Sequence, residues 1–101
     1  MKAAGRDGQG EDAPSTHGLS IYGYPQCPYC RRVLDVVSSL GLEIPLRNTL
    51  QDTAHRRALM AALGRATVPV LLIQEQAGDP KWLPESADIV RYLADRFGGE
   101  G

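Results

Sequence analysis

The sequence contains only two cysteines, Cys27 and Cys30, which lie three positions apart. Two clustered cysteines cannot form the spread disulfide framework of a small secreted domain. We therefore expect a reducing compartment, by default the cytosol, where disulfides are transient and catalytic. The two histidines, His17 and His55, lack paired ligand spacing, which argues against a zinc site completed around the cysteines. We expect no metal.

Neither sign of charge is in excess, because 11 basic side chains stand against 12 acidic ones, for a formal net charge of −1. The only adjacent basic pairs, Arg31-Arg32 and Arg56-Arg57, are typical of solvated helix faces, so we expect no nucleic-acid partner. No apolar run is long enough for a signal peptide or a membrane-spanning helix, so we expect no membrane association.

The N-terminal segment over 1–18 is rich in Gly, Asp, Glu, Ser and Pro and has almost no apolar side chains. Such a composition cannot bury enough apolar surface to offset the entropy cost of ordering. The sequence therefore predicts a disordered tail over 1–18, one folded domain over 19–98 and a short tail over 99–101.

Apolar periodicity within 19–98 predicts alternating strands and helices. The expected elements are a strand over 19–24, a helix from Pro28 to about Leu40, an edge strand over 42–48 containing Pro45, a helix from Asp52 or Thr53 to about Leu63, a buried strand over 68–73, a turn over 77–80, a short strand over 81–83 and a helix that Ser86 caps and Gly98 ends. The order is βαβ, α, ββα. It predicts an α/β domain of thioredoxin-like layout, with a mixed four-stranded sheet and helices on both faces.

Each predicted helix has one apolar face that should be buried. The inward residues are expected to be Cys30, Val33, Leu34 and Val37 in the first helix, Leu59, Met60 and Leu63 in the second, and Ile89, Val90, Leu93 and Phe97 in the last.

The stretch Cys27-Pro28-Tyr29-Cys30 places the first thiol at the N-cap of a helix, with Pro28 as its first residue. The backbone N–H groups of Tyr29 and Cys30 should then point toward the Cys27 sulfur. Together with the helix dipole they favour a thiolate, so we expect a lowered pKa and a nucleophilic Cys27. Cys30 is the expected resolving thiol. A zinc half-site and an inert structural disulfide are the alternatives, the latter disfavoured because so short a loop gives little stabilisation.

Three motifs together resemble a dithiol glutaredoxin: Cys-Pro-Tyr-Cys after the first strand, Thr67-Val68-Pro69 before the third, and Pro84-Glu85-Ser86 opening the last helix. The stretch over 83–93 is more similar to the glutathione-binding N-terminal domain of glutathione transferases and of the larger bacterial glutaredoxins. The resemblance implies a glutaredoxin version of the thioredoxin-like fold.

The resemblance also implies a glutathione site. Pro69 would follow a cis bond, and the Val68 backbone would pair with the cysteinyl unit of glutathione beside Cys27, with Tyr29 and Thr67 nearby. Ser86 would receive the γ-glutamyl carboxylate at a helix N-terminus. Glu85 would pair with the α-amino group, and Arg65 with the glycyl carboxylate.

The function implied is glutathione-dependent reduction of protein disulfides and glutathione mixed disulfides, with Cys27 as nucleophile and Cys30 as resolving thiol. The expected partners are glutathione and glutathionylated or disulfide-bonded proteins, and we expect a monomer. Three alternatives remain open: an iron–sulfur carrier in which two chains and two glutathiones hold a cluster through Cys27, a glutathione transferase acting on electrophiles, and a glutathione-independent redoxin supplied by a flavin reductase.

Overall fold

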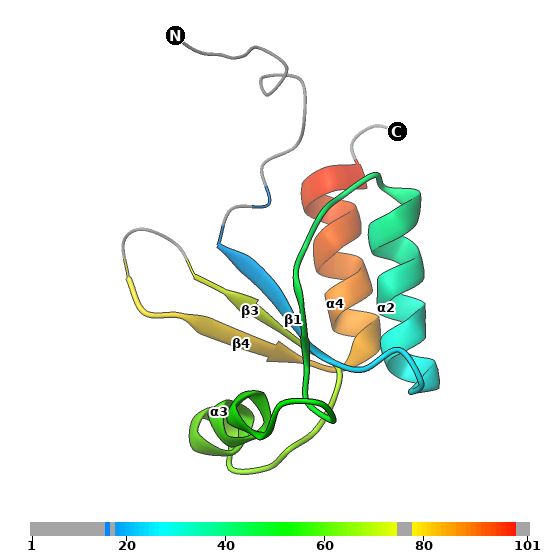
Figure 1. The fold of residues 1–101 in the computed structure, drawn as a ribbon. Coiled ribbons are helices and arrows are strands. Elements are labelled where there is room, and N and C mark those ends of the chain that lie inside the picture. Colours follow the sequence, from blue (N-terminus) through cyan, green and yellow to red (C-terminus); the bar gives the residue numbers. More distant parts are fainter. Residues whose placement is uncertain (1–15, 17, 75–77, 99–101) are drawn as a thin grey trace, which may run out of the picture.

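The computed structural model describes residues 16, 18–74 and 78–98 (Figure 1). The predicted tails over 1–18 and 99–101 lie outside the described residues, apart from positions 16 and 18, and so does the start of the predicted 77–80 turn. The elements are β1 (Leu19–Gly23), α2 (Pro28–Ser39), β2 (Leu46–Asn48), α3 (Thr53–Leu63), β3 (Val70–Ile73), β4 (Lys81–Pro84), α4 (Ser86–Leu93) and a π-helical turn η1 (Ala94–Gly98).

The four strands form one mixed sheet in the order β2-β1-β3-β4. β1 and β2 run parallel, as a βαβ crossover requires, whereas β3 is antiparallel to both β1 and β4. The interior strand β3 is buried at all four positions, which explains its uniformly apolar sequence. The predicted mixed sheet is confirmed.

Helices cover both faces of the sheet: α2 and α4 lie side by side on one face, and α3 lies on the other (Figure 1). Successive strand residues point to opposite faces, so Ile21 joins the cluster under α2 and α4, and Tyr22 joins the cluster under α3. The larger cluster includes Val33, Ile89 and Leu93, all fully buried. The predicted thioredoxin-like layout, with helices on both faces, is therefore confirmed.

The predicted helix boundaries rest on local signals that the structure reproduces. Cys27 is the N-cap of α2 with Pro28 following, and Gly41 takes a φ of +70° just beyond the helix. Asp52 caps α3, because its Oδ1 accepts the Ala54 N–H at 2.9 Å. Gly64 ends that helix at a φ of +76°.

Three predicted strands are shorter than expected. The first ends at Gly23, one residue before its predicted end. The second covers only Leu46–Asn48, because the segment over 42–44 is not paired with β1 and the first bond to β1 is made at Pro45, whose carbonyl accepts the Ile21 N–H at 2.9 Å. It is an edge strand, as Pro45 predicted. The third begins at Val70, after the cis bond between Val68 and Pro69.

Two side-chain predictions are wrong. Met60 was expected inside but is 43% exposed, because the inner line of α3 passes through the fully buried Leu59 and Met60 lies about 100° around the helix from it. Ser86 was expected to cap α4, but Glu85 is the N-cap and Ser86 is the first helical residue. The other predicted inward residues are buried or packed against the two clusters.

No helix within the described residues is long and apolar enough to cross a membrane. In the same part of the chain, no three His, Cys, Asp or Glu side chains gather as they would around a metal ion.

Candidate functional site

The cysteine pair, the cis-proline segment and the start of α4 are far apart in the sequence but lie at one edge of the sheet. β1 ends there. Tyr22 near the end of β1 pairs with Val70, the first residue of β3, so β3 begins at the same edge. Val70 in turn pairs with Pro84, the last residue of β4, so β4 also ends there. We call this the thiol edge, made of residues 24–30, 67–70 and 84–86. The topology therefore brings the cysteine pair, the cis-proline segment and the start of α4 together.

A cavity of about 330 Å³ opens between these three segments. This volume lies at the lower end of the range for small-molecule sites. Its lining residues are Tyr29, Thr67, Val68, Pro69, Glu85 and Ser86. Six of the seven residues predicted to bind glutathione thus surround one space. The seventh, Arg65, is exposed and is not among the lining residues.

The two thiols of the pair differ in environment. Cys27 is partly exposed at the N-cap of α2, whereas Cys30, one turn into the helix, is fully buried. Neither is in a disulfide. A thiol that can be reached from solvent therefore stands beside one that cannot.

Burial by itself would raise the pKa of Cys27, but hydrogen bonds from the backbone N–H groups of Cys30 and Tyr29 and from the Cys30 thiol outweigh it and lower the pKa. For Cys30, burial raises the pKa to about 11, a bond from the Tyr24 backbone opposes that rise, and the neighbouring Cys27 adds to it. The pair therefore separates into a thiolate-forming Cys27 and a protonated Cys30, the division that thiol exchange needs.

Gly23 is a site residue that the sequence did not single out. A β-carbon built at this position would lie 2.6 Å from the Cys30 Sγ and 3.7 Å from the Val68 Cβ. Only glycine lets the end of β1 approach both the resolving thiol and the cis-proline segment. A glycine at the end of a predicted buried strand, four positions before Cys27, is the signal that could have identified it.

Val68 and Pro69 are joined by a cis peptide bond, as expected from the resemblance. Pro69 is buried, whereas Thr67 and Val68 are half-buried at the cavity wall. Val68 therefore lies at the wall of a space that a ligand can enter, and it is close to Gly23, which also approaches the Cys30 thiol.

Glu85 has an unusual backbone conformation, with a φ of +76° and a ψ of 117°. It is the only non-glycine residue with positive φ in the described part of the chain, and such residues concentrate at functional sites. Its carbonyl accepts the Ile89 N–H at 3.0 Å and so begins α4, while its side chain is exposed. The next residue, Ser86, brings a hydroxyl and a free helix N-terminus to the cavity, which together suit an anion.

The family model of the glutathione S-transferase N-terminal domain matches residues 21–101. Among curated proteins, Glutaredoxin 2 of Escherichia coli strain K12 is 32% identical over 82 residues, which is 81% of this chain and 35% of that protein. The chain thus spans about a third of the length of the curated relatives it matches.

Solved structures are also similar. The maleylacetoacetate isomerase from Anaeromyxobacter dehalogenans 2CP-1, with dicarboxyethyl glutathione and citrate in its active site, is 26% identical with a TM-score of 0.62, covering 82% of this chain and 38% of that one. Glutathione transferase F7 from Populus trichocarpa is 26% identical with a TM-score of 0.63, over the same shares. A glutathione transferase from Bombyx mori is 21% identical with a TM-score of 0.67, covers 87% and 39%, and shares the fold.

Proposed function

The chain belongs to the glutathione S-transferase N-terminal domain family, and from this premise we propose that it is a glutathione-dependent thiol–disulfide oxidoreductase. One observation carries the proposal: a partly exposed Cys27 stands at the N-terminus of α2 with a buried Cys30 one turn behind it, and Tyr29 between them lines a cavity together with the cis-proline segment and the start of α4. Cys27 itself is not among the lining residues. The similarity to Glutaredoxin 2 supports the same chemistry.

Glutathione would lie along the cavity wall. The Val68 backbone would pair with its cysteinyl unit, and the helix N-terminus at Ser86 would receive its γ-glutamyl carboxylate. The exposed Glu85 carboxylate would pair with the α-amino group. Tyr29 and Thr67 would close the sides of the site. Arg65 would pair with the glycyl carboxylate from outside the lining residues.

In the first step, the Cys27 thiolate would attack the glutathionyl sulfur of a mixed disulfide. A bond would form between Cys27 and glutathione, and the bond to the substrate sulfur would break, so that the substrate leaves as a thiolate and takes a proton from water. A second glutathione thiolate would then attack the Cys27–glutathione disulfide. This attack would regenerate the Cys27 thiolate and release oxidised glutathione, so the two glutathione molecules together supply the two electrons that reduce the substrate disulfide.

Reduction of a protein disulfide would leave a Cys27–Cys30 disulfide, which two glutathione molecules would reduce to the two thiols, leaving as oxidised glutathione. The Cys27 thiolate would first attack one protein sulfur, form a mixed disulfide and release the other protein sulfur as a thiolate. Cys30 would then attack the Cys27 sulfur, form the Cys27–Cys30 disulfide and release the second protein thiolate. This second attack requires loss of the Cys30 proton, whose pKa is raised to about 11. Formation of the mixed disulfide removes the Cys27 negative charge, which is one of the causes of that rise, so the resolving thiol becomes easier to ionise at the moment it is needed.

The test is reduction of the mixed disulfide between glutathione and β-mercaptoethanol, followed as NADPH loss through glutathione reductase. Wild type, Cys27→Ser and Cys30→Ser are compared. We expect no turnover for Cys27→Ser. Cys30→Ser should keep deglutathionylation and lose reduction of a protein disulfide. An inactive wild type, or equal loss of both activities in Cys30→Ser, would contradict the mechanism.

A second candidate is a glutathione-binding domain that activates glutathione toward electrophiles, as in a glutathione transferase. The family match and the transferase and isomerase neighbours favour it. Conjugation of glutathione to 1-chloro-2,4-dinitrobenzene distinguishes the two functions. A transferase would catalyse this conjugation, whereas an oxidoreductase that acts through the Cys27 thiolate would not.

We also propose a reducing compartment such as the cytosol as the place of action, since catalytic thiols must be returned to the reduced state.

A further inference from the structure

The buried sulfur of Cys30 lies against the last residue of β1. A β-carbon built at Gly23 would be 2.6 Å from the Cys30 Sγ and 3.5 Å from the Cys30 Cβ, so the Gly23 backbone forms one wall around the thiol. Cys30 has no exposed surface, which leaves its position to be set by this packing. Glycine tolerates many backbone conformations, so a contact from outside β1 is needed to hold the wall in place.

A hydrogen bond from the turn after β2 provides that contact. The Thr49 N–H donates to the Gly23 carbonyl at 3.1 Å, just beyond the last residue pair of the two strands, Gly23 and Asn48. Thr49 is buried, so water does not compete strongly for this bond. The direction of the Gly23 carbonyl is therefore fixed by the turn after β2.

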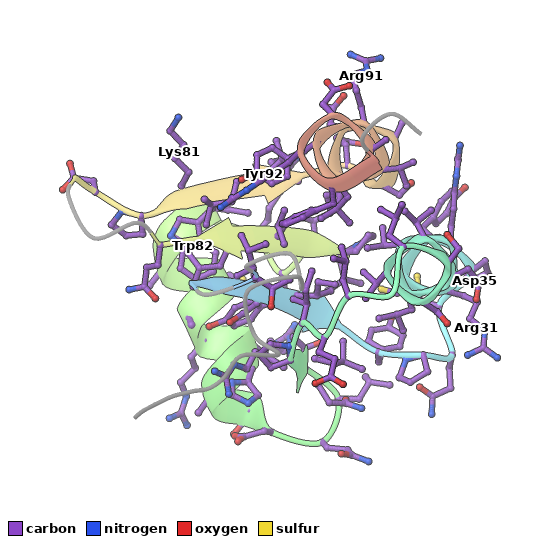
Figure 2. The ribbon with its side chains drawn as sticks, turned by 90° about the horizontal axis from the view of Figure 1, so that it is seen from above. Arg31, Asp35, Lys81, Trp82, Arg91 and Tyr92 are labelled. Atoms are coloured by element: carbon purple, nitrogen blue, oxygen red, sulfur yellow. The ribbon has the colours of Figure 1, made fainter. Side chains whose placement is uncertain are left out.

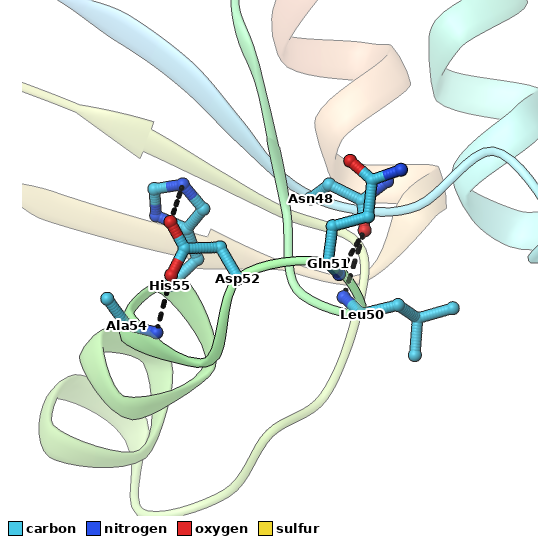
Figure 3. Close-up of polar contacts among 6 residues, drawn as sticks. All are labelled: Asn48, Leu50, Gln51, Asp52, Ala54 and His55. Atoms are coloured by element: carbon cyan, nitrogen blue, oxygen red, sulfur yellow. Dashed lines mark hydrogen bonds and ion pairs between the residues drawn. The ribbon is translucent and has the colours of Figure 1, made fainter.

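Asn48 in turn determines the shape of this turn. Its Oδ1 accepts the N–H groups of Leu50 at 2.9 Å and Gln51 at 3.0 Å, and its carbonyl accepts the Asp52 N–H at 3.1 Å (Figure 3). An Asn side chain that bonds the backbone two and three residues further on holds a turn in one conformation. Thr49 lies between these bonds, so its N–H is held in a fixed direction.

The fixed peptide also acts on the chemistry of Cys30. Burial raises the pKa of Cys30 to about 11, and the backbone N–H of Tyr24 opposes that rise by donating to the sulfur. This N–H belongs to the same peptide as the Gly23 carbonyl. A trans peptide is planar, with its carbonyl and its N–H pointing in opposite directions, so a bond that fixes one also fixes the other.

The charged side chains on α2 face solvent. Arg31, Arg32 and Asp35 are exposed, and Figure 2 shows Arg31 and Asp35 on the side of α2 remote from α4. In the part of the chain that the structure describes, Cys27 is the ionisable group that acts on Cys30, and its charge is removed when a mixed disulfide forms. The backbone at the end of β1 then remains to stabilise the Cys30 thiolate.

We infer that Asn48 is a positioning residue for Cys30, the resolving thiol. Asn48 holds the turn after β2, and the Thr49 N–H in that turn holds the end of β1 against the Cys30 sulfur. This inference rests on the part of the proposed function in which Cys30 resolves a mixed disulfide. It gives the end of β2 a role in the second attack, by Cys30, and not in the first attack, by Cys27.

The test follows the two thiols in turn by stopped flow, with one equivalent of 5,5′-dithiobis(2-nitrobenzoate), which releases a coloured thiolate at each step. The Cys27 thiolate attacks this disulfide, forms a mixed disulfide and releases the first thionitrobenzoate. Cys30 then loses its proton to solvent and attacks the Cys27 sulfur, and the second thionitrobenzoate leaves as the Cys27–Cys30 disulfide forms. The first phase measures Cys27, the second measures Cys30, and neither requires glutathione.

Asn48→Ala should slow the second phase about threefold at neutral pH. Without the bond from Tyr24, the fraction of Cys30 present as thiolate should fall about tenfold. The greater nucleophilicity of a more basic thiolate should return about half of that loss on a logarithmic scale. The first phase should change by less than about twofold, because the backbone N–H groups that bond the Cys27 sulfur belong to Cys30 and Tyr29, within α2.

Two further variants separate positioning from loss of stability. Asn48→Asp keeps a side-chain oxygen that can accept the same N–H groups, so its second phase should be within about twofold of wild type. Asp52→Ala is the matched control. It removes a bond of the same type, to the Ala54 N–H two residues further on at 2.9 Å, but that bond begins α3 and does not reach Gly23. It should lower the urea midpoint about as much as Asn48→Ala and leave both phases unchanged.

Failure of this inference and failure of the proposed function look different. Equal slowing of both phases by Asn48→Ala, equal slowing of the second phase by Asp52→Ala, or no recovery in Asn48→Asp would overturn the positioning role alone. A wild type without a second phase would also overturn it, because Cys30 would then not resolve. A wild type with both phases that does not reduce the glutathione–β-mercaptoethanol disulfide would refute the glutathione chemistry and leave the positioning of the thiol pair intact.

Discussion

Gly23→Ala tests whether the close approach of β1 to Cys30 is needed for stability and for thiolate formation. The added methyl group would be placed 2.6 Å from the Cys30 Sγ and 3.5 Å from the Cys30 Cβ. A carbon–sulfur contact at that distance cannot persist, and Cys30 is fully buried, so it has no open space to move into. Either the start of α2 or the end of β1 must shift.

Forcing one methyl group into a filled core usually costs about 1–3 kcal/mol. Replacing glycine by alanine also restricts the unfolded chain, which stabilises by about 0.4–1 kcal/mol where the backbone permits it. Gly98→Ala is the matched control, since its built β-carbon meets only the Ala94 Cβ at 3.8 Å, an ordinary contact. The difference in free energy of unfolding between the two variants should therefore be about 1–3 kcal/mol, with Gly23→Ala the less stable.

The same substitution should alter the chemistry of the pair. The Cys30 thiol and backbone N–H both stabilise the Cys27 thiolate, so moving Cys30 should raise the pKa of Cys27. Urea denaturation under reducing conditions measures the stability, and the pH profile of Cys27 alkylation measures the pKa. A Gly23→Ala protein as stable as Gly98→Ala, with an unchanged alkylation profile, would refute the reasoning.

Three further predictions follow from single contacts. Asp52→Ala removes the cap that accepts the Ala54 N–H and should lower the free energy of unfolding by about 1 kcal/mol in urea, with thiol alkylation unchanged. Glu85→Gly removes the strain of a positive φ and should raise the free energy of unfolding by about 1 kcal/mol, seen as a higher urea midpoint. The KM for glutathione should increase, because the carboxylate proposed to pair with the α-amino group is lost. A lower urea midpoint would contradict the assignment of strain to Glu85. The raised pKa of Cys30, about 11, means that the unfolded thiol ionises first. The stabilisation that comes from the protonated Cys30 is therefore complete below the unfolded pKa of roughly 8.5, and it is lost as the pH rises toward 11. In urea titrations across that pH range, wild type should lose stability by this route and Cys30→Ser should not.

Local sequence signals were enough for the elements and their ends. Pro28 after a capping Cys27, the glycines at 41 and 64, and Asp52 before α3 act through backbone conformation and hydrogen bonds within a few residues. Such signals do not depend on distant parts of the chain, which is why the predicted boundaries of α2 and α3 agree with the structure. The pattern of apolar residues likewise predicted the order of strands and helices along the chain, the mixed sheet and its cover of helices on both faces.

The errors have a different physical origin. Apolar periodicity predicted Met60 inside, but the exact rotation of α3 against the sheet is set by packing of Leu59 among Tyr22, Val70 and Leu72. Ser86 is a good capping residue by type, yet Glu85 takes the N-cap because β4 delivers the chain to α4 in a conformation with positive φ. Propensity is a weak prior where tertiary contacts determine the backbone.

The sequence by itself determined which residues could carry thiol chemistry and where each helix begins, because these depend on neighbours within one or two turns. Only the tertiary structure decided that Tyr29, Thr67 and Ser86 face one cavity, that Arg65 stays outside it, and that Gly23 makes room for Cys30. The cavity joins three segments that are far apart in the sequence, and they meet because of strand pairing, which no local pattern encodes. Gly23 and Cys30 are closer in the sequence, but their contact depends on how the end of β1 packs against α2.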